Sequence, residues 1–355
     1  MDALLSPRRR HLLTAMGAAT LAAACGVRPS AASGALHFAG PTMGSTYNVR
    51  LAGGPFDAEL EAAARAAVEA AFAGVVHRMS TYDAASELTR FNRHASSERF
   101  ALSPQTLSVL ARAQQVAAAS HGAFDVTVGP LVGAWGFGAA AAPRDGAVAR
   151  AALDAPVGWR QLSLDPVAGT ARKSAPGLQI DLSGIAKGHA VDSAAQALQA
   201  LGFERYMVEA GGEVRTQGLN AEGRPWQIAI ERPDSWPQQV HRLLPVQGLA
   251  MATSGDYRNF YEVAGRRYCH EIDPATRAPI THGLASVTVV HEECMAADAW
   301  ATALIVLGVE RGLALARAQG LAALFIVRDA GGALRDAVTP AFAALTLPGA
   351  GTARG

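Results

Sequence analysis

The amino-acid sequence predicts an α+β fold, a single domain with mainly antiparallel sheets and flanking helices. Apolar residues recur at helical spacing over 57–79, which predicts a long helix, and a serine cap followed by proline predicts a second helix at 104–120. From Gln161 onward the chain is rich in short strand-like runs separated by turn residues, as in a meander of neighbouring strands. The chain shows no internal repeat and no linker that would divide it, so we expect one domain.

The composition is that of an ordinary globular protein. The chain has 355 residues, of which 50% are hydrophobic and 17% charged, with a formal net charge of +1. This length is enough for one large or two small domains. The near-zero charge, and the lack of a basic stripe with interleaved aromatic residues, give no support for nucleic acid as a partner.

The first 24 residues predict a signal peptide. Three arginines, Arg8 to Arg10, precede an apolar run of 13 residues from Leu12 to Ala24, which is too short to span a bilayer. The consecutive arginines suggest twin-arginine export. Cys25 at the end of the run suggests a lipobox and a lipidated mature N-terminus, with cleavage at an Ala-x-Ala site without lipid as the alternative. We therefore expect an exported protein on the periplasmic side of the inner membrane, anchored at Cys25.

The remaining elements of the N-terminal half follow in order. Residues 25–36 are expected to form a tether and residues 46–51 a strand. A helix at 57–79 precedes a loop from Ser80 that leads into a short helix. The helix at 104–120 has Ser103 as its N-cap and Pro104 at its first position. Residues 122–138 are expected to be mostly loop, and 139–158 a surface insertion with a short helix.

The C-terminal half alternates strands and helices. We expect a strand at 178–182, a helix at 185–201, and a strand at 206–208 that ends at Gly211-Gly212. The further expected strands are 213–217, 226–231, 241–246, 266–272 and 284–291. Apolar residues nearly encircle the expected helix at 295–307, which predicts that it is buried. Another helix and one or two strands close the domain, and residues 347–355 are expected to be a disordered tail.

Two cysteines, Cys269 and Cys294, remain after the signal peptide. In an oxidising compartment they could pair, but neither their spacing nor their context requires it, and two buried free thiols are an equal alternative. No Cys/His pattern of a zinc site is present.

Two oxygen-rich motifs carry the clearest chemical signal. Asp181-Leu-Ser-Gly-Ile-Ala-Lys187-Gly has an acid, a hydroxyl, glycines and a lysine at an expected strand-to-helix turn, which suits an anion and a hard cation. Asp298 and Thr302 are four residues apart on a helix, so both oxygens face the same way. The alternatives are structural: Ser183 as a helix cap with Lys187 solvated in the first turn, and a hydrogen-bonded Asp298–Thr302 pair.

Further candidate residues carry weaker signals. His270 lies at the end of an expected strand before the Asp273-Pro274 turn, where a histidine can act as a general base or be a structural residue. Met43, Tyr82 and the Ala123-Phe124-Asp125 segment could enclose a planar ring, although core packing is the usual role of such residues.

Taken together these motifs resemble the ApbE family, the FAD:protein FMN transferases. The resemblance runs in order from about Phe38 to about Leu307. The motifs that carry it are Gly40-Pro-Thr-Met43-Gly-Ser-Thr-Tyr47, Met79-Ser-Thr-Tyr82-Asp-Ala-Ala-Ser86-Glu-Leu, Gly122-Ala-Phe-Asp125-Val-Thr-Val-Gly-Pro130-Leu, Asp181-Leu-Ser-Gly-Ile-Ala-Lys187-Gly, Ala210-Gly-Gly-Glu213, Thr253-Ser-Gly-Asp-Tyr257, His270-Glu-Ile-Asp273-Pro and Ala296-Ala-Asp298-Ala-Trp-Ala-Thr302.

The resemblance implies an ApbE-like domain over residues 37–346, with an FAD and Mg²⁺ site in a cleft between the sheets and the helices. It also implies transfer of FMN from FAD to a threonine or serine hydroxyl of an acceptor protein, such as a membrane redox-complex subunit, with release of AMP. By position, the implied Mg²⁺ ligands are Asp298, Thr302 and the backbone carbonyl of Ser183. The implied catalytic residues are His270 and Lys187. The implied FAD contacts are Met43, Tyr82, Ala123, Phe124, Asp125, Asp181, Lys187 and Ile272.

Two other functions are compatible with the sequence. An FAD pyrophosphatase would use water as the acceptor at the same site and give FMN and AMP. A non-catalytic periplasmic FAD-binding protein would need neither metal ligands nor a base.

The chain departs from the usual family pattern at two positions near His270. Arg277 stands where the family usually has glycine, which raises the cost of a positive φ in that turn. Glu271 replaces a residue that is usually apolar or small. Because neighbouring residues of a strand face opposite sides, we expect Glu271 to point away from His270 and to have little effect on it.

Overall fold

The computed structural model describes residues 34–139, 141–144 and 153–346. The expected signal peptide at 1–24, Cys25 and the tail at 347–355 lie outside the described residues. Strand β1 (Ala35–Thr42) already begins within the range expected as a tether, because Ala35 and Leu36 pair with Ala52 and Leu51. The last two residues of the expected tether are therefore part of the sheet.

An eight-stranded sheet forms the centre of the domain, in the order β1-β2-β6-β7-β10-β15-β16-β17. Every pairing within it is antiparallel. Its strands after β1 are β2 (Ser45–Ala52), β6 (Tyr206–Ala210), β7 (Glu213–Gln217), β10 (Ala250–Gly255), β15 (Leu284–His291), β16 (Ala322–Arg328) and β17 (Leu334–Val338). The predicted α+β class with mainly antiparallel sheets is confirmed.

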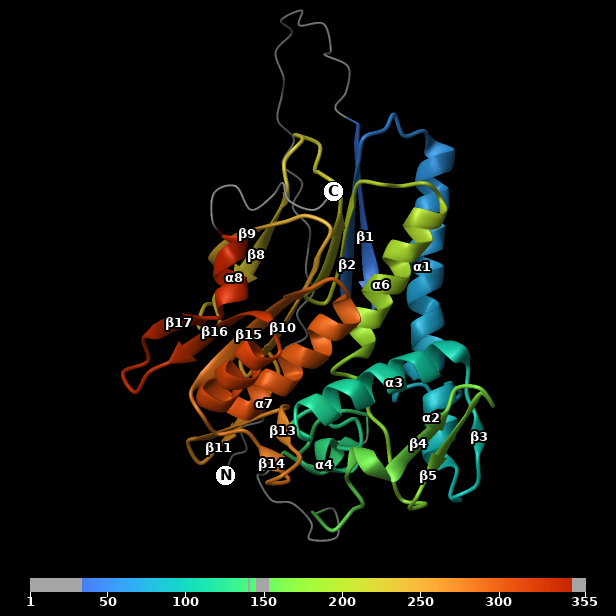
Figure 1. Cartoon of the computed structure of the whole chain (residues 1–355), viewed down its shortest axis with the longest axis vertical. Helices are drawn as coiled ribbons and strands as arrows, with labels where there is room; N and C mark the ends of the chain where they lie inside the picture. Colours follow the sequence, from blue (N-terminus) through green and yellow to red (C-terminus); the bar gives the residue numbers. More distant parts are fainter. Residues whose placement is uncertain (1–33, 140, 145–152, 347–355) are drawn as a thin grey trace, which may run out of the picture. The chain divides into compact units, whose positions relative to one another are not determined.

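Long helices cover one face of this sheet (Figure 1). They are α1 (Ala58–Met79), α6 (Ala186–Ala200) and α7 (Cys294–Ala318), and a further helix, α3 (Pro104–Ala119), packs against α7. Alternate residues of β2, namely Tyr47, Val49 and Leu51, point into the core beneath them. Helix α7 is long and apolar enough to cross a membrane by length and composition, but much of its surface is buried in this core, as its encircling apolar residues predicted.

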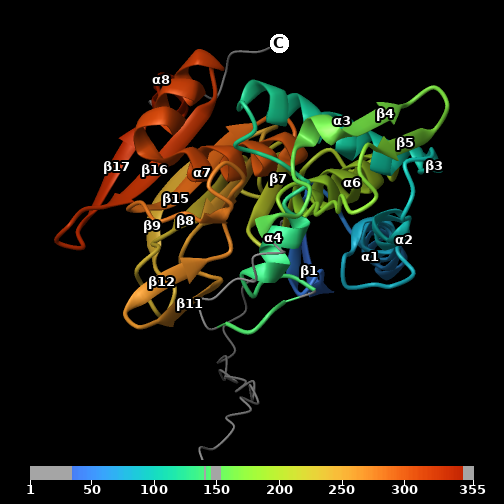
Figure 2. The ribbon, with the colours of Figure 1, turned by 90° about the horizontal axis from the view of Figure 1, so that it is seen from below.

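The opposite face carries a smaller second core. The hairpin of β8 (Trp226–Glu231) and β9 (Val240–Val246) packs there together with α8 (Pro340–Leu345), which lies beside β16 (Figures 1 and 2). Ile230 and Leu244 of the hairpin and Phe342 of α8 are buried in this core. The sheet is therefore covered by helices on one side and by a hairpin and a short helix on the other.

The remaining elements of the domain are short. They are α2 (Glu87–Arg93), α4 (Gly129–Ala134), a 3₁₀ turn (Trp159–Gln161), the three-stranded sheet of β3 (Phe100–Ala101), β5 (Thr170–Lys173) and β4 (Leu162–Asp165), and the hairpins β11 (Phe260–Val263) with β12 (Arg266–Cys269) and β13 (Ile272–Asp273) with β14 (Ala278–Pro279).

Most of the predicted elements are present. The predicted cap of α3 is confirmed, because the side chain of Ser103 accepts a hydrogen bond from the backbone N–H of Thr106. Helix α7 extends beyond the predicted end at Leu307, across a break at Gly308, where φ is 74°. The short helix α4 lies in a region predicted to be mostly loop. Part of the predicted insertion at 139–158 falls outside the described residues.

Two predicted strands are wrong in whole or in part. The segment 178–182 is not a strand, because the side chain of Asn92 binds both backbone groups of Ile180 and so takes the place of a neighbouring strand. The backbone N–H of Asp181 donates instead to the carbonyl of Val126. The predicted strand at 266–272 is interrupted between Cys269 and Ile272, since β12 pairs with β11 and β13 with β14.

Candidate active site

A single cavity of about 1080 Å³ contains most of the predicted site residues. It extends from the N-terminal end of α6 to α7, β10 and the β12–β13 connection. The predicted residues that line it are Tyr82, Ala123, Phe124, Asp125, Asp181, Ser183, Lys187, His270, Ile272, Asp298 and Thr302. Met43 is not part of this lining. It lies in the turn between β1 and β2 with φ of 47°, partly buried against the main core.

The two oxygen-rich motifs meet at this cavity. Asp298 and Thr302 lie one turn apart on α7, and the Asp298 carboxylate is only 3% exposed. A Cβ atom built on Gly184 would lie 3.0 Å from Thr302 Oγ1, so the loop of the first motif packs directly against α7. The hydroxyl of Thr302 is 3.3 Å from that of Ser254 on β10. Segments more than 100 residues apart in sequence therefore form one oxygen-lined surface.

The carboxylate of Asp181 stabilises the loop before α6, and this loop does not follow a strand. Asp181 Oδ1 accepts a hydrogen bond of 2.8 Å from the backbone N–H of Ser183. The N-cap residue of α6 is Ile185, and no side chain caps the helix there. The structural alternative in which Ser183 caps the helix is therefore wrong. Ser183 is exposed and faces the cavity instead.

These residues fit a hard cation. Burial raises the pKa of Asp298, while the charge of Lys187 and the N–H of Gly188 oppose that shift, so the carboxylate gains from a nearby positive charge. Among the described residues there is no group of three or more His, Cys, Asp or Glu that could hold a metal. The available donors are one carboxylate, hydroxyls and backbone carbonyls, which suit an oxygen-preferring ion with open coordination positions.

Lys187 is not a solvated first-turn lysine. Its Nζ forms an ion pair with Oε1 of Glu213, which begins β7 and is 1% exposed. Burial alone would lower the pKa of Lys187, but the carboxylates of Glu213 and Asp298 outweigh it and raise the pKa. Burial raises the pKa of Glu213, and the positive charge of Lys187 opposes that rise. The other oxygen of Glu213, Oε2, is buried without a hydrogen-bond partner in the described part of the chain.

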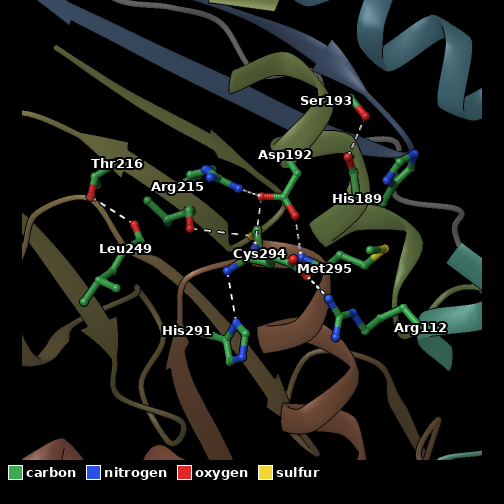
Figure 3. A network of polar contacts seen from close by, with 12 residues as sticks. Arg112, His189, Asp192, Ser193, Arg215, Thr216, Leu249, His291, Cys294 and Met295 are labelled. Atoms are coloured by element: carbon green, nitrogen blue, oxygen red, sulfur yellow. Dashed lines mark hydrogen bonds and ion pairs between the residues drawn. The ribbon is translucent and has the colours of Figure 1, made fainter. Parts of the chain in front are cut away.

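Each of the helices α6 and α7 has a carboxylate that accepts hydrogen bonds from the backbone of the other helix. Asp192 on α6 accepts hydrogen bonds from the backbone N–H groups of Cys294 (3.0 Å) and Met295 (2.9 Å), the first two residues of α7 (Figure 3). Asp298 on α7 accepts one of 3.0 Å from the N–H of Gly188 on α6. Both carboxylates occupy the positive end of a helix dipole, which stabilises them.

Asp192 is also anchored to the sheet, since it forms an ion pair with Arg215 of β7 (Figure 3). Glu213 and Arg215 are alternate residues of this strand and pair with Lys187 and Asp192 of α6. Sequence reasoning assigned no role to Glu213, Asp192 or Arg215. The Gly211-Gly212-Glu213 motif was the available signal, because a carboxylate follows a glycine pair at the start of a strand.

The predicted flavin contacts form another wall of the cavity. Phe124 and Ile272 are 3% and 5% exposed, whereas Tyr82 is 75% exposed at the surface. The carboxylate of Asp125 accepts bonds from the N–H and hydroxyl of Thr127 and from the N–H of Trp159. Burial raises the pKa of Asp125, and the Thr127 bonds oppose that shift. Asp125 thus orders the loop that presents Phe124.

His270 lies at the break between β12 and β13 and lines the cavity together with its neighbour Glu271. Nε2 of His270 is 3.5 Å from Oε1 of Glu271. The prediction that Glu271 points to the opposite side is wrong, because the regular alternation of a strand is interrupted at these two residues.

The turn after His270 does require a positive φ. Arg277, at the usual glycine position, has φ of 58°. Its carbonyl accepts a hydrogen bond from Nε1 of Trp135, and its guanidinium donates to the carbonyls of Leu153 and Ala155. These contacts hold an arginine in a conformation that costs little for glycine.

The two cysteines Cys269 and Cys294 are both buried and do not form a disulfide bond.

Comparisons with known proteins agree with this geometry. The model of the ApbE family matches residues 43–325. A Vibrio cholerae protein named FAD:protein FMN transferase is 44% identical over 324 residues, which cover 90% of this chain and 94% of that protein. A Haemophilus influenzae protein of the same name is 41% identical over 304 residues, covering 84% of this chain and 88% of that one.

Solved structures show the same similarity. The structure of the flavin transferase ApbE from Vibrio cholerae covers 88% of this chain and 99% of its own, at 42% identity and a TM-score of 0.79. The apo form of the flavinyl transferase ApbE from Pseudomonas stutzeri gives the same TM-score at 39% identity, covering 88% of this chain and 96% of its own. The chain belongs to the ApbE family.

Proposed function

We propose that this protein transfers FMN from FAD to a threonine or serine hydroxyl of an acceptor protein and releases AMP. The observation that carries the proposal is the single cavity lined by Asp298 and Thr302, by Lys187 and by His270. Transfer of a phosphoryl group needs charge neutralisation, positioning and a proton acceptor, and these residues can supply all three. Relatives that are 44% and 41% identical to this chain carry the name of this activity.

The flavin half of FAD would lie against the wall that contains Tyr82, Phe124 and Ile272. Apolar and aromatic side chains favour a planar ring, and Phe124 and Ile272 are buried in fixed positions. Met43 was a predicted contact, but it lies outside the cavity lining, so its role stays a prediction. Asp125 would act by ordering the loop, since its carboxylate oxygens already accept three hydrogen bonds.

We further propose that Asp298, Thr302 and the backbone carbonyl of Ser183 hold Mg²⁺. Bound there, Mg²⁺ would neutralise negative charge on the pyrophosphate of FAD. Lys187 would add a second positive charge close by. Its ammonium stays protonated over the working pH range, because Glu213 and Asp298 raise its pKa.

The reaction exchanges one phosphorus–oxygen bond for another and moves one proton. The acceptor hydroxyl oxygen would attack the phosphorus of the FMN half, and the bond from that phosphorus to the bridging oxygen would break. AMP would leave with the bridging oxygen, and the hydroxyl proton would pass to His270. The imidazole suits this role because histidine is the most common general base in enzymes and this side chain is 37% exposed beside the cavity.

The acceptor and the location are proposed from the sequence. Consecutive arginines, a short apolar run and Cys25 support export with a lipid anchor on the periplasmic side of the inner membrane. An enzyme held there would meet the exported parts of membrane redox complexes, so a subunit of such a complex is the proposed acceptor.

The test uses purified protein with FAD, Mg²⁺ and an unflavinylated fragment of a redox subunit that carries the acceptor threonine. We expect the fragment to become fluorescent on a denaturing gel and AMP to appear in equal amount. The same fragment with its acceptor threonine changed to alanine is the control and should stay unlabelled. AMP without labelled fragment would instead support an FAD pyrophosphatase, and FAD binding without AMP a carrier protein.

A further inference from the structure

Glu271 is a buried carboxylate at the proposed site that neither the fold nor the proposed chemistry has yet explained. Its side chain is 8% exposed, and it lines the cavity beside His270. Among the residues that the structure describes, His270 is the basic side chain within ion-pair distance of this carboxylate, with Nε2 at 3.5 Å from Oε1.

The chain geometry explains why both neighbours reach the same cavity. The N–H of His270 donates to the carbonyl of Asn259, next to strand β11. The carbonyl of Glu271 accepts from the N–H of Ile280, next to strand β14. The chain thus crosses from one two-stranded sheet to another between these two residues, and the usual opposition of neighbouring side chains is lost.

The surroundings of Glu271 disfavour the ionised form of its carboxyl group. Burial raises the pKa of Glu271, Asp298 and Asp256 add to that rise, and His270 and Lys187 oppose it. Its neighbour Cys269 has a pKa raised to about 12 by burial and then by the Glu271 charge. A glutamine would fill the same space without a charge, so packing alone does not account for a glutamate here.

The contact with Glu271 is made through Nε2 of His270 and leaves the other ring nitrogen unpaired in the described part of the chain. Nδ1 of the His270 ring is buried and has no hydrogen-bond partner in the described part of the chain. The ring meets Phe137 edge to face, with 6.4 Å between centroids. The carboxylate of Glu271, 3.5 Å from Nε2, is therefore the charged group placed to hold the ring.

We propose that Glu271 is a positioning residue for His270, holding the imidazole and stabilising the imidazolium that forms when His270 takes the proton of the acceptor hydroxyl. This inference rests on the proposed function. The proton moves from the acceptor oxygen to the imidazole ring and stays there until AMP has left, while Glu271 remains an anion throughout. Glu271 contacts neither FAD nor the acceptor in this scheme and acts only through His270.

A double-mutant cycle tests the proposal in the full protein. E271Q should lower the transfer rate by about tenfold or more, with little change in KM for FAD. E271D, which keeps the charge, should retain more of the rate than E271Q. In an H270A background, E271Q should have no further effect, because the residue through which it acts is missing.

The control is E262Q on the neighbouring strand β11, which removes a carboxylate outside the cavity lining and should leave the rate unchanged. A wild-type rate in E271Q overturns the inference, as does a tenfold loss that persists in the H270A background. Equal loss of FAD affinity in both backgrounds indicates a structural role and also overturns it. If the wild-type protein does not label the acceptor at all, the proposed function fails instead.

Discussion

The backbone N–H of Gly188 on α6 donates a hydrogen bond of 3.0 Å to Oδ2 of Asp298 on α7. In the opposite direction, Asp192 on α6 accepts hydrogen bonds from the first two backbone N–H groups of α7. The distance between the two helices therefore fixes where Asp298 and Thr302 lie relative to Lys187.

Gly188→Ala should destabilise the protein. A Cβ at this position would lie 2.4 Å from the carbonyl oxygen of Cys294, so α6 and α7 must move apart. Overpacking of this kind costs about 1–3 kcal/mol. Urea unfolding measures the loss. The control is Gly74→Ala in α1, where the Cβ meets only the flexible end of Arg78 and should be neutral or stabilising. Equal effects of the two substitutions would contradict the proposed helix contact.

Asp298→Asn should abolish most transfer activity while leaving the fold intact. The amide keeps the size of the side chain but loses the charge that a cation requires, so we expect the rate to fall by at least about 100-fold. Binding of Mn²⁺ as a probe, followed by electron paramagnetic resonance, should weaken in parallel. Asp57→Asn, at the exposed N-cap of α1, is the matched control. Undiminished Mn²⁺ binding in the Asp298 variant would exclude Asp298 as a ligand.

Lys187→Met should destabilise the protein by leaving Glu213 buried without its cation. Because the Lys187 side chain is about one third exposed, we expect a modest loss of roughly 1–3 kcal/mol. Adding Glu213→Gln removes the uncompensated charge and should restore part of the stability. Thermal unfolding of both single variants and the double variant gives the coupling. Strict additivity would show that the two side chains do not depend on each other.

Two substitutions of Arg277 separate the backbone from the side chain. Both Arg277→Gly and Arg277→Ala lose the bonds to the carbonyls of Leu153 and Ala155. Only glycine relieves the positive φ of 58°. The glycine variant should therefore be the more stable of the two by about 1 kcal/mol in urea unfolding. An alanine variant as stable as the glycine variant would mean that the turn has rearranged.

The stability of the wild-type protein should fall relative to Glu271→Gln as the pH rises. Burial raises the pKa of Glu271 in the folded state, so the folded protein holds this proton more tightly than the unfolded chain. Stability is then lost as the pH rises through the folded-state pKa, by at most about 1.4 kcal/mol per pH unit. Urea unfolding from pH 4 to pH 8.5 measures it. A constant difference between the two proteins would contradict the prediction.

The sequence by itself determined the helices and most of the sheet. Apolar residues at helical spacing define α1, α3 and α6, and the encircling apolar residues of α7 predicted that this helix is buried. These features depend on local periodicity, which a single chain records directly. The expected strand at 178–182 failed for the opposite reason, since the partner of Ile180 is the side chain of Asn92, remote in sequence.

The candidate site also combines residues that the sequence predicts with partners that it does not. Asp181, Lys187, Asp298 and Thr302 were recognisable from their motifs, because these residue types at short spacings suit a phosphate and a cation. His270 was a candidate mainly through the family resemblance. The partners of these residues were not recognisable in the sequence. Glu213 reaches Lys187, and Asp192 reaches the start of α7, only through the packing of α6 against β7 and α7.

Glu271 marks the limit of sequence reasoning in this protein. The residue pattern from 266 to 272 predicts one continuous strand, and the alternation of such a strand would point the Glu271 side chain away from His270. The tertiary structure breaks that strand between two separate hairpin partners and turns Glu271 toward His270. Local spacing thus determined which side chains are available, and only the long-range pairing of strands and helices decided which of them meet.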